Sequence, residues 1–78
     1  MIRVKVKVIG ALLKPDGKDE FIHECKKNIT IRELLSKLKY NERHIEYIMS
    51  SVNEELKSRD YVLKNNDSLV LLTIIGGG

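Results

Sequence analysis

The first residues of the chain alternate between apolar and polar side chains, in the segment IRVKVKV at positions 2–8. A period of two fits a β-strand, whose successive side chains point to opposite faces of a sheet, and it does not fit an α-helix. One face takes Ile2, Val4, Val6 and Val8, and the other takes Arg3, Lys5 and Lys7. The sequence therefore predicts a sheet with one buried face and one face in contact with water.

A second strand is predicted to return beside the first. The segment KPDG at residues 14–17 is the strongest turn signal in the chain, because proline presets φ and glycine accepts a positive φ. Residues 18–25 would then form the return strand of a hairpin. We expect Phe21 and Cys25 to face inward.

The predicted helix begins at a capping box, TIRE, at residues 30–33. In this motif the hydroxyl of Thr30 accepts a hydrogen bond from the amide of Glu33, while the glutamate reaches back to the threonine. The spacing of the apolar residues that follow predicts a helix over residues 31–39, with a stop at residues 40–41. Its apolar face, expected to pack on the sheet, consists of Ile31, Leu34, Leu35 and Leu38.

The second half of the chain predicts short strands joined by turns. Residues 41–46 are interpreted as a polar connection, and turns are predicted at residues 53–54 and 65–67, where asparagine tolerates left-handed backbone. The strands are predicted at residues 47–52, 55–58 and 69–75. This order of elements specifies an α+β domain, with one main helix on one face of a mixed sheet of four to five strands.

Length and composition limit the class of protein. Seventy-eight residues allow one domain, which we place at residues 1–75, followed by a glycine tail at residues 76–78 that is expected to be flexible. The longest apolar run, residues 69–75, is far shorter than a transmembrane helix, and the N-terminus has no export signal. We therefore expect a cytoplasmic protein that is monomeric when free.

The sequence contains no group of residues in the arrangement that a catalytic or metal site needs. The single cysteine, Cys25, cannot form an internal disulfide, and His23 and His44 do not complete a set of metal ligands with it. No Ser/His/Asp arrangement, phosphate-binding glycine loop or carboxylate pair is present. A net charge of +3 and 5% aromatic residues make nucleic acid a minor candidate. We expect neither a metal nor a bound cofactor.

The last residues, NDSLVLLTIIGGG at positions 66–78, place a turn, a strand and a glycine terminus in direct succession. With the order of the elements, this segment resembles the ubiquitin-like β-grasp proteins, and more closely the ThiS/MoaD family of sulfur carriers. The segment VNEE at 52–55 resembles the family's turn between its middle strands. Residues 73–75 lack the paired prolines of the molybdopterin branch, whereas the long first hairpin is closer to that branch.

The resemblance implies that the chain is a protein co-substrate and not an enzyme. An E1-like partner enzyme would use ATP to adenylate the carboxylate of Gly78, and a sulfur donor would displace AMP to leave a thiocarboxylate. Gly76 and Gly77 would thread the partner's channel, because a residue without a Cβ fits a narrow passage. The sulfur would pass to a downstream synthase or acceptor in thiamin biosynthesis, molybdopterin biosynthesis or tRNA thiolation.

The last strand also predicts where a partner binds. Val70 and Leu72 alternate with the neighbouring leucines, so they lie on the open face of the sheet if those leucines are buried. An exposed apolar patch there would be a docking surface, while the alternative is a strand buried on both faces. The predicted partner-binding residues are Val70, Leu72, Ile74 and Ile75, with Met49 or Ile48 beside them.

Other functions remain open at this point. A ubiquitin-like modifier would pass the same activated Gly78 to lysines of target proteins. An RNA-binding β-grasp module would instead use the basic row Arg3, Lys5 and Lys7, although a solvated strand face explains that row equally simply. In a sulfur-handling protein Cys25 could relay sulfur, but a lone strand cysteine is more often a small buried hydrophobe.

Overall fold

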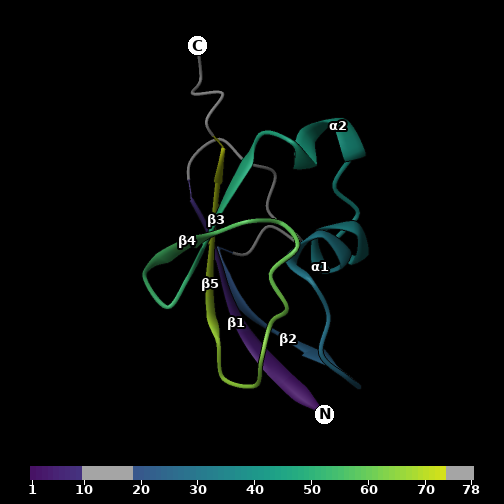
Figure 1. The fold of residues 1–78 in the computed structure, drawn as a ribbon, viewed down its shortest axis with the longest axis vertical. Helices are drawn as coiled ribbons and strands as arrows, with labels where there is room; N and C mark the ends of the chain where they lie inside the picture. The colour runs from purple at the N-terminus through teal and green to yellow at the C-terminus, as the bar shows by residue number, and fades with distance from the viewer. Residues whose placement is uncertain (10–18, 74–78) are drawn as a thin grey trace.

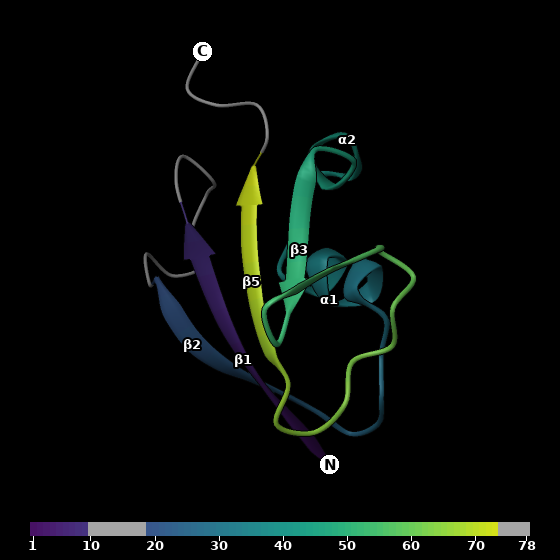
Figure 2. The ribbon, with the colours of Figure 1, turned by 60° about the vertical axis from the view of Figure 1, so that its left-hand side comes forward.

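The computed structural model describes residues 1–9 and 19–73. Within these residues one five-stranded sheet carries two helices on one side, as Figures 1 and 2 show. The elements are β1 (Ile2–Ile9), β2 (Glu20–Cys25), α1 (Ile31–Lys37), α2 (Glu42–Ile45), β3 (Ile48–Val52), β4 (Glu55–Lys57) and β5 (Ser68–Thr73). The strand order is β2-β1-β5-β3-β4, with β1 parallel to β5 and the other neighbours antiparallel. The predicted α+β architecture with a mixed sheet is confirmed.

The core lies between the sheet and α1. The alternation in β1 gives the predicted result, because its even-numbered residues are buried and its odd-numbered residues are exposed. Three helical residues that were predicted to face the sheet are fully buried, and Leu38 packs partly buried against them. In the return strand β2, Cys25 is buried and Phe21 packs against the core, so the predicted inward face is confirmed. The fully buried helical residues are Ile31, Leu34 and Leu35.

Helix α1 starts as predicted and ends earlier. Oγ1 of Thr30 accepts from the N–H of Glu33 at 3.1 Å, and Oε1 of Glu33 accepts from the N–H of Thr30 at 2.9 Å. The predicted end at residue 39 is wrong, because the helix ends at Lys37 and Lys39 has a φ of 68°. Tertiary packing favours this end, since Tyr40, just beyond it, is buried in the core.

A second, short helix occupies the segment that was predicted to be only a polar connection. The side chain of Asn41 accepts a hydrogen bond from the N–H of Arg43 at 2.9 Å and begins α2. Ile45 is buried at 2% exposure. One apolar residue in a polar segment gives no helical period, so this helix is stabilised by a tertiary contact that local sequence does not indicate.

The turns between the later strands use left-handed backbone at the predicted positions. Asn53 and Glu54 have φ values of 52° and 72°, as a two-residue type I′ hairpin turn requires, and Asn66 has a φ of 70°. The strands differ from the predicted bounds by one or two residues at their ends. The predicted turn at 14–17 and the predicted strand residues 74–75 lie outside the described residues.

Candidate partner-binding face of the sheet

Strand β5 lies in the middle of the sheet, between β1 and β3 (Figure 2). Its odd-numbered leucines point into the core, with Leu69 at 1% and Leu71 at 0% exposure. Val70 and Leu72 are half-buried and lie on the opposite face, away from α1 and α2, the helices of the described residues (Figure 2). The alternative of a strand buried on both faces is therefore wrong, and the predicted placement of Val70 and Leu72 is correct.

The register of the strands adds neighbours to these two residues. Leu72 pairs with Ile9 on β1 and with Met49 on β3, and Ile9 is 43% exposed. One strand further on, Leu56 is 65% exposed and pairs with Ser51, which in turn pairs with Val70. The open face therefore carries an apolar patch, which we define as Ile9, Met49, Leu56, Val70 and Leu72.

Sequence reasoning identified part of this patch. The proposal of Ile48 as a neighbour is wrong, because Ile48 is 4% exposed and faces the core, whereas Met49 lies on the open face. Ile9 and Leu56 were missed. The sequence could have placed Ile9 on the open face, because Ile9 continues the exposed row of β1 that contains Arg3, Lys5 and Lys7. The sequence could not have placed Leu56 there, because its position on the open face depends on the pairing of β4 with β3.

A buried polar cluster fixes the start of β5. Asp67 is 6% exposed, and its carboxylate accepts from Nδ2 of Asn53 at 3.0 Å and from the N–H of Lys64 at 2.8 Å. Oδ1 of Asn53 accepts from the N–H of Ser68 at 3.0 Å, and the N–H of Asn53 donates to the carbonyl of Ser68 at 2.9 Å. These bonds tie the β3–β4 turn to β5. They set the register that places Val70 and Leu72 in the apolar patch.

The structure does not describe the positions of the site residues that were predicted at the end of the chain. Ile74, Ile75, Gly76, Gly77 and Gly78 all lie outside the described residues, so their predicted roles stay predictions. What the structure describes is the strand that leads toward them and the face around that strand (Figure 1).

The sequence profile of the ThiS family matches residues 6–78, which is nearly the whole chain. The chain belongs to the ThiS family. The family consists of small ubiquitin-like sulfur carriers, so this ThiS-family protein is a sulfur carrier and not a catalyst. The resemblance inferred from the turn, last strand and glycine terminus is thereby confirmed.

The fold of this ThiS-family protein is similar to that of a solved relative. A protein assigned as molybdopterin converting factor subunit 1 from Pyrococcus furiosus superimposes with a TM-score of 0.74 and 24% sequence identity. The superposition covers 94% of this chain and 98% of that one. It identifies the fold as the ubiquitin-like β-grasp. Among curated proteins, none matches the sequence.

Cys25 of the ThiS-family protein does not have the environment of a reactive thiol. Cys25 is buried, and burial raises the pKa of its thiol, which disfavours the thiolate that sulfur chemistry needs. This supports the interpretation of Cys25 as a small buried hydrophobe. Over residues 1–9 and 19–73 no three His, Cys, Asp or Glu side chains are placed to hold a metal ion. No helix in the same part of the chain is long and apolar enough to cross a membrane.

Proposed function

We propose that this ThiS-family protein carries sulfur as a thiocarboxylate on Gly78. The observation that carries the proposal is the family match, whose bounds, residues 6–78, include the three glycines at residues 76–78. An E1-like partner enzyme binds ATP and adenylates the Gly78 carboxylate. A downstream synthase then takes the sulfur for thiamin or molybdopterin biosynthesis or for tRNA thiolation.

The chemistry needs activation because a carboxylate is a poor electrophile. In the first step a carboxylate oxygen of Gly78 attacks the α-phosphorus of ATP, and pyrophosphate leaves. In the second step hydrosulfide from the sulfur donor attacks the acyl carbon, AMP leaves with that oxygen, and loss of a proton gives the thiocarboxylate. Sulfur thereby replaces one oxygen, and the thiocarboxylate sulfur is a soft nucleophile. The carrier supplies the reacting carboxylate, and the partner supplies the catalytic groups.

The apolar patch supplies the contact that this reaction requires. Val70 and Leu72 lie on the strand that leads to the tail, and Ile9 and Met49 flank Leu72 on the neighbouring strands. A partner that covers this patch removes apolar surface from water and holds β5 in place while the tail enters the active site. In this proposal Ile74 and Ile75 line the partner's groove, and Gly76 and Gly77 pass through its channel.

The test is to incubate the purified protein with an E1-like enzyme, ATP and a sulfide source. Mass spectrometry is expected to show the exchange of one oxygen for sulfur, located on Gly78. Adding one residue after Gly78 should abolish the exchange, because the new carboxylate lies about 3.5 Å further along the channel. Gly78→Ala should slow the reaction, since a Cβ crowds the reacting carbon.

Cys25→Ser is the matched control and should be thiolated normally. The proposal is wrong if the sulfur is found on Cys25, or if the extended protein is thiolated as readily as the native one. Transfer of Gly78 to lysines of another protein in the same mixture, without a thiocarboxylate, would point to a modifier instead.

A further inference from the structure

A shallow groove of about 330 Å³ opens on the same uncovered face as the apolar patch, toward the start of β5. It is lined by Arg3, Lys5, Ile22, Asn66 and Ser68. Two of these side chains are cations, and two others carry neutral hydrogen-bond donors. No carboxylate is among the described residues that line the groove.

The charges around the groove are not balanced at Lys5. On the outer strand β2, Glu24 stands opposite Arg3 and Glu20 stands opposite Lys7. Lys5 instead lies between Ile22 on β2 and Ser68 on β5. No ion pair joins Lys5 to another residue of the described segments. Among the described cations of this face, Lys5 is therefore the one with no acidic residue directly opposite it on a neighbouring strand.

The neutral donors of the groove are also unused. The backbone of Ser68 bonds with Asn53, and the backbone N–H of Asn66 donates to the carbonyl of Arg3 at 2.8 Å. In the described part of the chain no hydrogen bond uses the hydroxyl of Ser68 or the side-chain amide of Asn66. The groove thus presents cationic and neutral donors together, an arrangement that suits an oxygen anion.

The groove and the apolar patch lie at a fixed spacing on one rigid sheet. Lys5 pairs with Ser68, and Leu72 is four residues further along β5. At about 3.3 Å per residue Val70 lies about 7 Å from Ser68, and Leu72 lies about 13 Å from it. A surface that covers both must therefore carry an apolar group over Leu72, near the tail, and an acid about 13 Å behind it.

We propose that this groove receives an aspartate or glutamate side chain of the adenylating partner, paired with Lys5 and Arg3. The inference rests on the proposed function and adds the chemistry of the partner's surface. A protein carboxylate is favoured over an RNA phosphate, because the same face continues into the apolar patch and the described residues that line the groove include no aromatic ring to stack a base. The ion pair fixes the direction in which the carrier docks.

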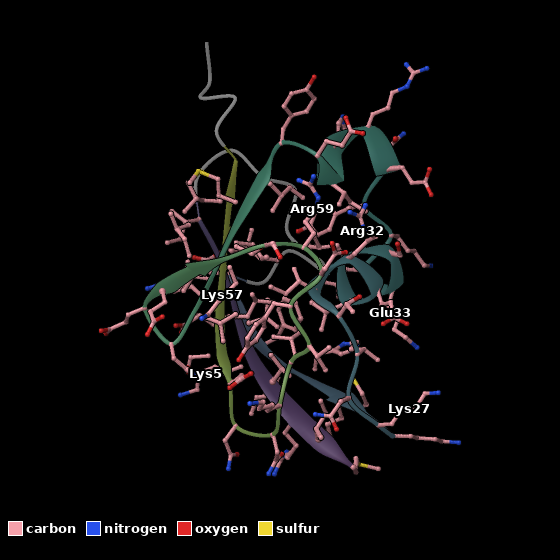
Figure 3. All side chains as sticks on the ribbon, in the orientation of Figure 1. Lys5, Lys27, Arg32, Glu33, Lys57 and Arg59 are labelled. Atoms are coloured by element: carbon pink, nitrogen blue, oxygen red, sulfur yellow. The ribbon has the colours of Figure 1, made fainter. Side chains whose placement is uncertain are left out.

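The experiment compares two charge reversals in the thiolation assay. Lys5→Glu should raise KM for the carrier on the order of tenfold at low salt and leave kcat unchanged, because docking is weakened and the tail is intact. Lys27→Glu is the matched control. Lys27 is exposed in the loop between β2 and α1, away from Lys5 (Figure 3), and its reversal changes the net charge equally. The effect of Lys5→Glu should shrink as salt screens the pair.

A second readout is a zero-length carbodiimide crosslink between the native carrier and its partner. Mass spectrometry should find Lys5 joined to an aspartate or glutamate, and replacing that acid by lysine should restore the KM of Lys5→Glu. Equal KM values for the Lys5→Glu and Lys27→Glu proteins, with normal thiolation of Gly78, overturn the inference and leave the proposed function standing. Failure of the unmodified carrier to be thiolated overturns both. Loss of binding to a labelled RNA oligonucleotide, with KM unchanged, assigns the groove to RNA and rejects the inference.

Discussion

Asp67 and Ser50 are the buried polar side chains of the described residues, and their environments differ. The carboxylate of Asp67 accepts hydrogen bonds from two parts of the chain, whereas Oγ of Ser50 has no partner there. A buried acceptor that is hydrogen-bonded stabilises the fold, because removing it leaves its buried donors without a partner. A buried hydroxyl without a partner contributes no such term.

This difference predicts opposite mutational results. Asp67→Ala should lower the free energy of unfolding by about 1–3 kcal/mol, because the N–H of Lys64 and the amide of Asn53 lose their acceptor. Ser50→Ala should leave stability unchanged or raise it. Urea denaturation measures both, and Asp60→Ala, on an exposed side chain with a long 3.7 Å ion pair, is the control that should have little effect. A small effect of Asp67→Ala would contradict the structural role of this cluster.

His23 gives the fold a dependence on pH. It is half-buried on β2, and burial, with a smaller effect from Lys37, lowers the pKa of its imidazole below the ordinary value. The unfolded chain, with a pKa of about 6.5, then binds a proton more readily than the folded protein. The stability contribution is complete above that pH and is lost as pH falls through the lowered folded pKa.

The predicted outcome is a lower urea midpoint at pH 5 than at pH 7.5. His23→Gln should reduce the difference between the two midpoints, because the titrating group is removed. His44→Gln, on an exposed side chain of α2, should preserve it. A pH dependence that is the same in the native and His23→Gln proteins would rule out His23 as its source.

At the scale of the element, β5 has two faces with different tasks. Leu69 and Leu71 bind the strand to the core, while Val70 and Leu72 face outward in the apolar patch. A charge on the inner face must be buried without a partner, which costs far more than a charge at the half-buried outer face. In β5 the odd-numbered residues therefore stabilise the fold, while the even-numbered residues are available to bind a partner.

Val70→Asp and Leu72→Asp should leave the fold largely intact and weaken capture by the adenylating enzyme, because the covered patch would then bury an unpaired carboxylate. Circular dichroism tests the fold, and KM in the thiolation assay tests capture. Leu69→Asp is the matched control on the adjacent position and should unfold the domain. The parity argument fails if Val70→Asp unfolds the protein equally.

At the scale of the molecule, the centre of the sheet joins the two ends of the sequence. Strand β1 pairs in parallel with β5, from Lys5 with Ser68 to Ile9 with Leu72. Strand β4 is the shortest of the described strands, with three residues, and it lies at the edge of the sheet. The pairing of β1 with β5 therefore joins residues that are far apart in the sequence. These contacts form only when the whole domain folds.

Amide hydrogen exchange in low urea should show this organisation. Amides of β1 and β5 that are bonded to neighbouring strands should exchange only by global unfolding, with a steep dependence on urea. Amides of β4 should exchange by local opening, with a shallow dependence. Protection of β4 equal to that of β5 would contradict the expected order.

Features that depend on near neighbours in the chain could be predicted from the sequence. The alternation in residues 2–8 fixed which side chains of β1 are buried, and the capping box fixed the start of α1 at Ile31. The parity of Val70 and Leu72 followed from the leucines beside them. These features are local because a strand period, or a hydrogen bond over three residues, is encoded within one segment.

Features that join distant segments could not be predicted from the sequence and became visible in the folded chain. Ile45 is held in the core by packing, so its helix left no period in the sequence. The apolar patch gains Leu56 through strand pairing, and the groove exists because parallel pairing sets Lys5 beside Ser68. Register between strands depends on which long-range contacts bury the most apolar surface, and no single segment contains that information.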